Sequence, residues 1–191
     1  METENKIINL FIEENIPKTI REISKKIKSD YKITHTATQR LLGKNILISK
    51  KIGQSSLCEL NNSFYSSDIY AVENKRKDNL LKNKNLKQLY HEVIVKIKSA
   101  FFIFIIFGSY ATGKQTKSSD IDILFVSNEQ GFEENISNAL SLLPLKTHAL
   151  VFTEDEFIRM KDSKKSNVVK EIIKNNVILY GIENYYRLKN A

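Results

Sequence analysis

The residues that could do chemistry in this chain are a glycine–serine pair and two aspartates that follow it. Gly108 and Ser109 come directly after the apolar run FFIFIIF, and Asp120 and Asp122 open a second apolar run, DIDILFV. Carboxylate oxygens bind hard cations such as Mg²⁺, and a glycine lets the backbone approach a phosphate group. Residues two apart on a strand leave the same face, so we expect both aspartates to point together. Metal carboxylates opposite a phosphate cradle indicate phosphoryl or nucleotidyl transfer.

The same segment also fits part of an ATPase phosphate loop. Gly108 to Lys114 match the first seven positions of G-x-x-x-x-G-K-[ST]. The eighth position is Gln115, which lacks the hydroxyl that would hold magnesium. A phosphate loop also runs directly into a long helix, whereas only QTKSS separates Lys114 from the next strand-like run. The spacing therefore favours the transferase interpretation over steady ATP hydrolysis.

Further side chains in this segment could contact a nucleotide. Ser109 offers a hydroxyl and an amide at the start of a short helix, where backbone N–H groups attract anions. Lysines in the following loop could neutralise phosphate charge, although a solvated surface position is the alternative for them. The candidate nucleotide-binding residues are Gly108, Ser109, Lys114, Lys117 and Ser119.

The spacing of these groups resembles that of a known family. A Gly-Ser pair, ten residues and then Asp-Ile-Asp, all after an apolar strand, is similar to the nucleotidyltransferase superfamily of DNA polymerase beta in its minimal form. The resemblance covers about residues 80–187 and includes the closing NNVILYGIENYYRL, which is similar to the family's final strand and tail. It implies a short mixed sheet flanked by helices.

The resemblance also implies roles for individual residues. Asp120 and Asp122 would bind Mg²⁺ or Mn²⁺, and Gly108 and Ser109 would hold ATP or another nucleoside triphosphate. The implied reaction is in-line attack by an acceptor hydroxyl on the α-phosphorus, with pyrophosphate leaving. Minimal members of this family include antitoxin-like proteins that modify a partner protein, so the resemblance also implies an acceptor protein.

The chain departs from the family pattern at the third carboxylate, which normally comes from a later strand. The expected strand, LKTHALVF at residues 145–152, contains none. His148 is the substitute we consider, because a neutral imidazole can ligate metal or take a proton, and a packed histidine is the alternative. In the TEDEF sequence that follows, Thr153 and Glu156 predict a capping box at a helix start. Nucleotide binding without turnover is therefore an alternative function.

The N-terminal third has the periodicity of three short helices. Apolar residues recur at helical spacing in residues 5–14 and again in residues 17–27. The stretch ITHTATQRLLGKN predicts the third helix, with Thr34 or Thr36 as its N-cap. Two short strands then form a predicted hairpin around Gly53.

This order of elements resembles a winged helix-turn-helix DNA-binding domain. The resemblance implies that the third helix presents polar and basic side chains to the major groove, and that the hairpin brings lysines near its tip. The candidate DNA-binding residues are Thr36, Thr38, Gln39, Arg40, Lys44, Lys50 and Lys51. Protein–protein contact is the alternative use of the same element order.

The charge distribution supports a nucleic-acid partner for the first half. Residues 1–100 hold 19 Lys and Arg against 11 Asp and Glu, whereas residues 101–191 hold 11 of each, so the net charge of +8 lies entirely in the first half. Clustered cations are what phosphate neutralisation needs. A general Lys, Asn and Ile bias of composition is the alternative explanation.

Composition also bears on the compartment. Cys58 is the only cysteine, which excludes an intramolecular disulfide and fits a reducing compartment. The longest apolar run, AFFIFIIF, has eight residues, against about 20 for a membrane helix. The N-terminal sequence lacks the order of a secretory signal. We therefore expect a cytoplasmic protein without a membrane partner.

Together these patterns predict an α+β protein of three parts. A winged helix-turn-helix domain would occupy residues 1–65, a charged linker or helix residues 66–84, and a minimal nucleotidyltransferase domain residues 85–191. The expected partners are DNA, a nucleoside triphosphate, an acceptor protein and a second copy of the chain. The alternative to a transferase is a DNA-binding regulator whose transferase-like domain is inactive and senses nucleotide or mediates oligomerisation.

Overall fold

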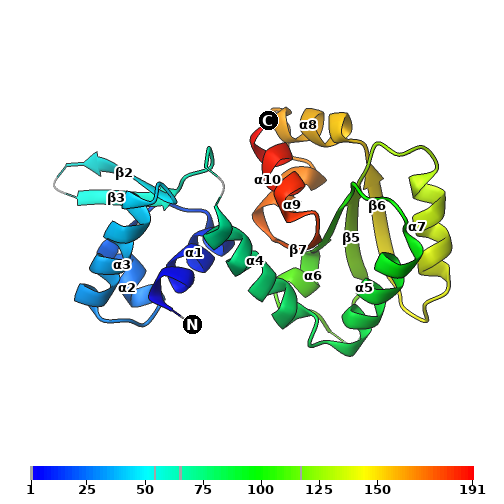
Figure 1. Cartoon of the computed structure of the whole chain (residues 1–191), viewed down its shortest axis with the longest axis horizontal. Coiled ribbons are helices and arrows are strands. Elements are labelled where there is room, and N and C mark those ends of the chain that lie inside the picture. The colour runs from blue at the N-terminus through cyan, green and yellow to red at the C-terminus, as the bar shows by residue number, and fades with distance from the viewer. Residues whose placement is uncertain (1, 54, 65, 117) are drawn as a thin grey trace. The chain divides into compact units, whose positions relative to one another are not determined.

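A computed structural model describes residues 2–53, 55–64, 66–116 and 118–191 (Figure 1). The chain divides into two compact units, Met1–Val72 and Glu73–Ala191, and the division falls within helix α4 (Ser67–Leu80). Each unit has its own sheet and its own buried side chains. The two units are described separately.

The first unit is built from short helices and a small antiparallel sheet. Its elements in chain order are α1 (Thr3–Glu14), β1 (Lys18–Thr19), α2 (Ile20–Lys26), α3 (Tyr31–Gly43), β2 (Leu47–Ile52) and β3 (Ser55–Leu60). Strand β3 lies between β1 and β2 and is antiparallel to both. Apolar side chains from all three helices are fully buried, including Ile7, Phe11, Ile23 and Leu41. Each such side chain contributes about 1.5–3 kcal/mol when it is buried.

Helix α3 begins one turn earlier than the sequence predicts. Asp30 is its N-cap, and the carboxylate accepts hydrogen bonds from the backbone N–H groups of Lys32 and Ile33 at 2.8 and 3.2 Å. Thr34 therefore lies inside the helix and is not its cap. The expected surface position of Thr38 is wrong, because this side chain is buried and its hydroxyl donates to the carbonyl of Thr34 at 2.8 Å.

The second unit alternates helices with the strands of one mixed sheet. Its elements after α4 are α5 (Lys84–Lys96), β4 (Ile103–Phe107), α6 (Gly108–Ala111), β5 (Ile121–Val126), α7 (Phe132–Ser141), β6 (Thr147–Phe152), α8 (Glu154–Asp162), α9 (Val168–Lys174), β7 (Asn176–Tyr180) and α10 (Ile182–Asn190). The strand order is β6-β5-β4-β7. Strand β4 is antiparallel to both neighbours, whereas β5 and β6 are parallel. The predicted short mixed sheet flanked by helices is confirmed.

Two groups of helices cover this sheet. Apolar side chains of α5 and α7 form a buried cluster with alternate residues of β4, β5 and β7, among them Phe104 and Phe125, whose rings stack with centroids 4.7 Å apart. Helices α8, α9 and α10 group on the other side of the sheet (Figure 1). Because both faces are covered, β4 is buried from Ile103 to Ile106, as its uninterrupted apolar sequence predicts.

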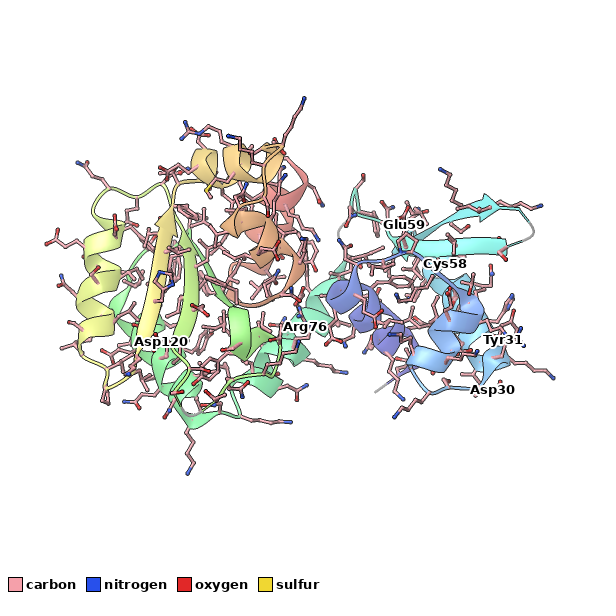
Figure 2. The ribbon with its side chains drawn as sticks, turned by 180° about the vertical axis from the view of Figure 1, so that it is seen from behind. Asp30, Tyr31, Cys58, Glu59, Arg76 and Asp120 are labelled. Carbon is pink, nitrogen blue, oxygen red and sulfur yellow. The ribbon has the colours of Figure 1, made fainter. Side chains whose placement is uncertain are left out.

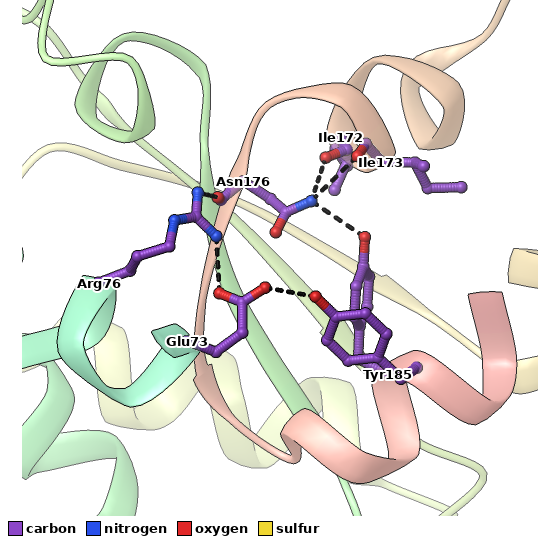
Figure 3. A network of polar contacts seen from close by, with 7 residues as sticks. Glu73, Arg76, Ile172, Ile173, Asn176 and Tyr185 are labelled. Atoms are coloured by element: carbon purple, nitrogen blue, oxygen red, sulfur yellow. Dashed lines mark hydrogen bonds and ion pairs between the residues drawn. The ribbon is translucent and has the colours of Figure 1, made fainter. Parts of the chain in front are cut away.

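A buried polar network ties the second half of α4 to the end of this unit (Figure 3). Glu73 is 1% exposed, and its carboxylate accepts hydrogen bonds from Arg76 at 2.6 Å and from the Tyr186 hydroxyl at 2.7 Å. Arg76 also donates to the backbone carbonyl of Asn176 at 2.6 Å. The Asn176 amide in turn donates to the Tyr185 hydroxyl at 3.0 Å. A buried carboxylate is tolerated only when it is paired in this way.

The described part of the chain contains no helix that is long and apolar enough to span a membrane.

Candidate functional site

The end of β4 and the start of β5 meet at a close contact between a glycine and a carboxylate. Gly108 opens the four-residue helix α6 with a φ of 65°, a left-handed conformation that side chains other than glycine rarely adopt. A Cβ atom built on Gly108 would overlap Oδ2 of Asp122. The absence of a side chain at this position therefore lets the first turn of α6 lie directly against the carboxylate.

Asp122 faces a histidine on the neighbouring strand. In the parallel register of β5 and β6, Asp122 is paired with His148, and His148 Nδ1 lies 3.5 Å from Asp122 Oδ1. The side chain of His148 is 62% exposed and that of Asp122 is 31% exposed, so both are open to a ligand. The isoleucines on either side of Asp122 are buried, as the alternation along a strand predicts.

Asp120 stands immediately before β5 and is exposed. It lines a cavity of about 590 Å³ together with residues of α7, of β6 and of the connection between them, among them Ser141, Lys146 and Thr147. Among the residues that the structure describes, no three His, Cys, Asp or Glu side chains group closely enough to hold a metal ion. The structure thus brings Gly108, Asp122 and His148 together.

The loop between α6 and β5 is held by short-range hydrogen bonds. The Thr112 hydroxyl lies 3.1 Å from the carbonyl of Gly108 and 3.2 Å from that of Ser109, where it can donate to the end of α6. The backbone N–H of Lys114 donates to the Ser109 carbonyl at 2.9 Å, and the Lys114 side chain is exposed. The Ser119 hydroxyl accepts from the N–H of Thr116 at 2.9 Å and so closes the next turn.

Lys117, one of the candidate nucleotide-binding residues, lies outside the described residues.

The phosphate-loop alternative does not fit this geometry. Helix α6 ends after four residues, and the chain returns as β5, antiparallel to β4. An ATPase phosphate loop leads instead into a long helix that carries the lysine and the magnesium-binding hydroxyl at its start. The short connection that QTKSS predicted is therefore confirmed.

The acidic run after β6 has a structural role. Thr153 Oγ1 accepts from the N–H of Glu156 at 3.2 Å, and the Glu156 carboxylate accepts from the N–H of Thr153 at 2.8 Å. These reciprocal bonds lower the pKa of Glu156, mainly through the hydrogen bond from the Thr153 backbone. The predicted capping box is confirmed.

The candidate DNA-binding residues of the first unit have different environments. Thr36, Gln39, Lys50 and Lys51 are exposed. Arg40 of α3 and Lys44, the C-cap of that helix, are exposed as well, but both are engaged in ion pairs. Arg40 lies 3.6 Å from the Glu4 carboxylate, and Lys44 lies 3.2 Å from Glu4 and 3.6 Å from Asp68. The sequence analysis missed both acidic partners, because the pairs join residues distant in the sequence.

Comparison with known protein families identifies the second unit. A family model described as polymerase beta, nucleotidyltransferase matches residues 84–185, which is more than half of the chain. The chain therefore belongs to this nucleotidyltransferase family. No curated protein and no solved structure matches this chain significantly. The family and the mixed sheet agree with the resemblance carried by the Gly-Ser and Asp-x-Asp spacing.

Proposed function

We propose that the chain is a divalent-metal-dependent nucleotidyltransferase that carries a DNA-binding domain. The proposed enzyme transfers AMP or another nucleoside monophosphate to a hydroxyl group of a protein or small molecule. A bond forms between the acceptor oxygen and the α-phosphorus, the bond from that phosphorus to the bridging oxygen breaks, and pyrophosphate leaves with its electrons. The proposed domains are a winged helix in residues 1–65, a charged helical connection in residues 66–84 and the transferase in residues 85–191.

The observation that carries the transferase proposal is the contact of Gly108 with the Asp122 carboxylate. Phosphate binding by backbone N–H groups needs a close approach of the ligand to the chain, and a glycine at a helix start permits it. Here Gly108 lies against the carboxylate of Asp122, and carboxylate oxygens are ligands of hard cations such as Mg²⁺. The proposed phosphate cradle and the proposed metal ligand therefore adjoin each other.

The donor atoms fit Mg²⁺ or Mn²⁺. Mg²⁺ in phosphoryl-transfer sites is held by one or two carboxylates and completes its shell with water and substrate phosphates, so a preformed cage of three protein ligands is not required. Asp122 and Asp120 would supply the carboxylates. When bound, the cation would supply charge neutralisation to the triphosphate.

Each residue of the site has a proposed part. The amides of Gly108 and Ser109 would hold the triphosphate, with Ser119 beside them and Lys114 and Lys117 neutralising its charge. His148 would take the place of the third carboxylate that the family normally supplies, because it faces Asp122 from the next strand. It would either ligate the cation or accept the proton of the attacking hydroxyl.

For the first unit we propose a winged helix that binds DNA. The order α1, β1, α2, α3, β2, β3 supports this, as does the sheet in which β1 pairs with the hairpin. The exposed lysines of β2, Lys50 and Lys51, favour contact with a polyanion. DNA binding would bring the transferase to a DNA site, or it would let the protein regulate its own expression.

The transferase proposal is tested with α-labelled nucleotides. The purified chain is incubated with Mg²⁺ or Mn²⁺ and each of the four labelled triphosphates, alone and with proteins from its native host. We expect label to move to a protein or small molecule with the wild type, and not with Asp122→Asn. Glu133→Gln, which removes an exposed carboxylate from α7, serves as the control and should keep the activity.

A second function is favoured by the position of Asp120. Because Asp120 lines a cavity apart from Asp122 and His148, the domain could bind nucleotide without turning it over, and the chain would then be a nucleotide-sensing DNA-binding regulator. This alternative predicts that ATP binds to the wild type, that no label is transferred, and that nucleotide changes the affinity for DNA.

A further inference from the structure

Helix α3 exposes two sides with different electrostatic surroundings. One side carries Ile33, Thr36 and Arg40, which line a cavity of about 360 Å³ together with residues from the start of α1. Two of those residues are carboxylates, Glu2 and Glu4. Lys32 and Arg40 line the same cavity, so a polyanion that approached this side would meet two carboxylates beside two cations.

Two of the cations on this side, Arg40 and Lys44, are already paired, and Lys32 is a further cation of the cavity. Glu4 lies 3.6 Å from Arg40 and 3.2 Å from Lys44, and its side chain is only 13% exposed. Glu4 and Asp68 also raise the pKa of Lys44, with the hydrogen bond to Glu4 as the main cause. Arg40 and Lys44 therefore hold α1 and α4 to α3, and DNA would have to compete with these carboxylates for them.

The other exposed side carries Tyr31, His35 and Gln39, which are spaced by four and so lie in one row along the helix. Tyr31 is 50% exposed, and its ring lies 6.1 Å from that of His35. Figure 2 shows Tyr31 beside Asp30 at the beginning of α3, with its side chain directed outward. Tyrosine, histidine and glutamine have polar tips that can donate to and accept from base edges or phosphates.

A second cavity adjoins the beginning of this row. It has a volume of about 390 Å³ and is lined by Arg21, Ser24, Lys25 and Tyr31. Arg21 and Lys25 lie one turn apart on α2 and both are exposed. No acidic residue lines this cavity. It therefore combines two cations with an aromatic hydroxyl, a combination that suits a phosphate group.

The carboxylates that lie nearest in sequence to Arg21, Lys25 and Tyr31 already accept hydrogen bonds from the ends of α2 and α3. Glu22 accepts hydrogen bonds from the N–H and the hydroxyl of Thr19 at 2.7 and 2.8 Å. Asp30 accepts from two N–H groups of the first turn of α3. Within the described chain, neither Arg21 nor Lys25 has a carboxylate within ion-pairing distance, in contrast to Lys18 and Lys26, which both pair with Glu14.

We propose that duplex DNA is held by this second side of the first unit. Arg21 and Lys25 contact backbone phosphates at the α2–α3 cavity, and Tyr31, His35 and Gln39 face the groove. Arg40 and Lys44 stabilise the fold through Glu4 and Asp68 and contribute little to DNA affinity. The inference rests on the proposed DNA-binding function. It assigns the phosphate contacts to Arg21 and Lys25 in place of Arg40 and Lys44.

Two double variants of the full chain that lose the same charge test the inference. Arg21→Ala with Lys25→Ala removes the cations of the cavity, and Arg40→Ala with Lys44→Ala removes those paired with Glu4. Binding is measured by fluorescence anisotropy with a labelled DNA duplex over a series of salt concentrations. We expect the first variant to bind about tenfold or more weakly, with a salt-dependence slope reduced by about 1 to 2. We expect the second to lose less than about threefold.

Thermal unfolding separates binding from folding. The Arg40 and Lys44 variant should have the lower melting temperature, because Glu4 loses its partners, whereas the cavity variant should melt like the wild type. If the double cavity variant is poorly folded, Lys25→Gln alone is measured in its place, and a loss of about threefold is expected.

The outcomes distinguish this inference from the proposal on which it rests. A larger loss of affinity for the Arg40 and Lys44 variant, with both variants folded, would overturn the inference and leave DNA binding intact. Tighter binding of duplex RNA than of duplex DNA would overturn the choice of ligand. If the wild type does not bind DNA even at low salt, DNA binding and this inference both fail, and the transferase proposal is unaffected.

Discussion

Gly108 and Asp122 approach so closely that the carboxylate of Asp122 occupies the space where a side chain of residue 108 would begin. Gly108 follows directly after β4, and Asp122 is the second residue of β5, which is antiparallel to β4. This contact joins the proposed phosphate cradle to the proposed metal ligand, and the first prediction concerns it.

Gly108→Ala should abolish nucleotidyl transfer. The added methyl group would displace the Asp122 carboxylate, and the left-handed backbone would be strained by about 1–3 kcal/mol. Gly113→Ala is the matched control, because Gly113 also has a positive φ, of 68°, but a Cβ there meets no atom within 4 Å. Both variants should lose similar thermal stability, while only Gly108→Ala should lose transfer, measured by the label assay. Equal activity of the two would show that the contact has no functional role.

His148 should shift the metal preference of the site. An imidazole favours Mn²⁺ over Mg²⁺ relative to a carboxylate, because nitrogen is the softer donor. We expect His148→Ala to weaken Mn²⁺ binding about tenfold and His148→Asp to strengthen Mg²⁺ binding, both measured by titration with paramagnetic Mn²⁺ as the reporter. His91→Ala, at an exposed position on α5, controls for the loss of a histidine. If the Mn²⁺ affinity of His148→Ala equals that of the wild type, His148 is not a metal ligand.

Asp120 and Asp122 should differ in their contributions. Asp122→Asn removes the carboxylate against Gly108 and should lower the transfer rate at least about hundredfold, since even outer-shell losses cost 10–100-fold at metal sites. Asp120→Asn should lower it as strongly only if Asp120 joins Asp122 when nucleotide and metal bind. Single-turnover rates of the two variants decide this. Retention of full activity in Asp120→Asn would restrict the metal site to Asp122 and its partners.

Glu73 should be essential for the stability of the second unit. Glu73→Gln leaves Arg76 buried without its charge partner and should lower the free energy of unfolding by about 3–5 kcal/mol. Asp78→Asn, which removes an exposed carboxylate from the same helix, should change it by less than about 0.5 kcal/mol. Urea titration followed by circular dichroism measures both. A loss below about 1 kcal/mol for Glu73→Gln would contradict a structural role for the pair.

Two buried tyrosines predict a loss of stability in alkali. Burial, and next the nearby Glu73 carboxylate, raises the pKa of Tyr185 and that of Tyr186 above the ordinary value of 10.0. Above about pH 10 the unfolded chain therefore releases these protons while the folded chain retains them, and the free energy of unfolding falls as pH rises. Tyr186→Phe should make this fall less steep. An unchanged slope between pH 10 and 11 would show that Tyr186 ionises freely in the folded chain.

Local patterns in the sequence predicted much of the fold and part of the site. The uninterrupted apolar run of β4, the short helix after Gly108 and the capping box at Thr153 depend on neighbours within a few residues, so composition and spacing are sufficient to predict them. The helix start at Asp30 was misplaced because several nearby polar residues can serve as caps, and only the observed hydrogen bonds distinguish among them. Thr38 was expected on the surface because its side chain is polar, but it lies one turn after the buried Thr34 and next to the buried Ala37.

The sequence by itself determined the nucleotidyltransferase family, because the apolar strand, the Gly-Ser pair that follows it and the Asp-x-Asp group lie within one short segment. Only the tertiary structure decided that Asp122 faces His148, that Asp120 lines a cavity beside α7, and that Glu4 and Asp68 engage Arg40 and Lys44. These relationships join residues from different elements. They depend on strand register and helix packing, which are set by the burial of the whole core and leave no local trace in the sequence.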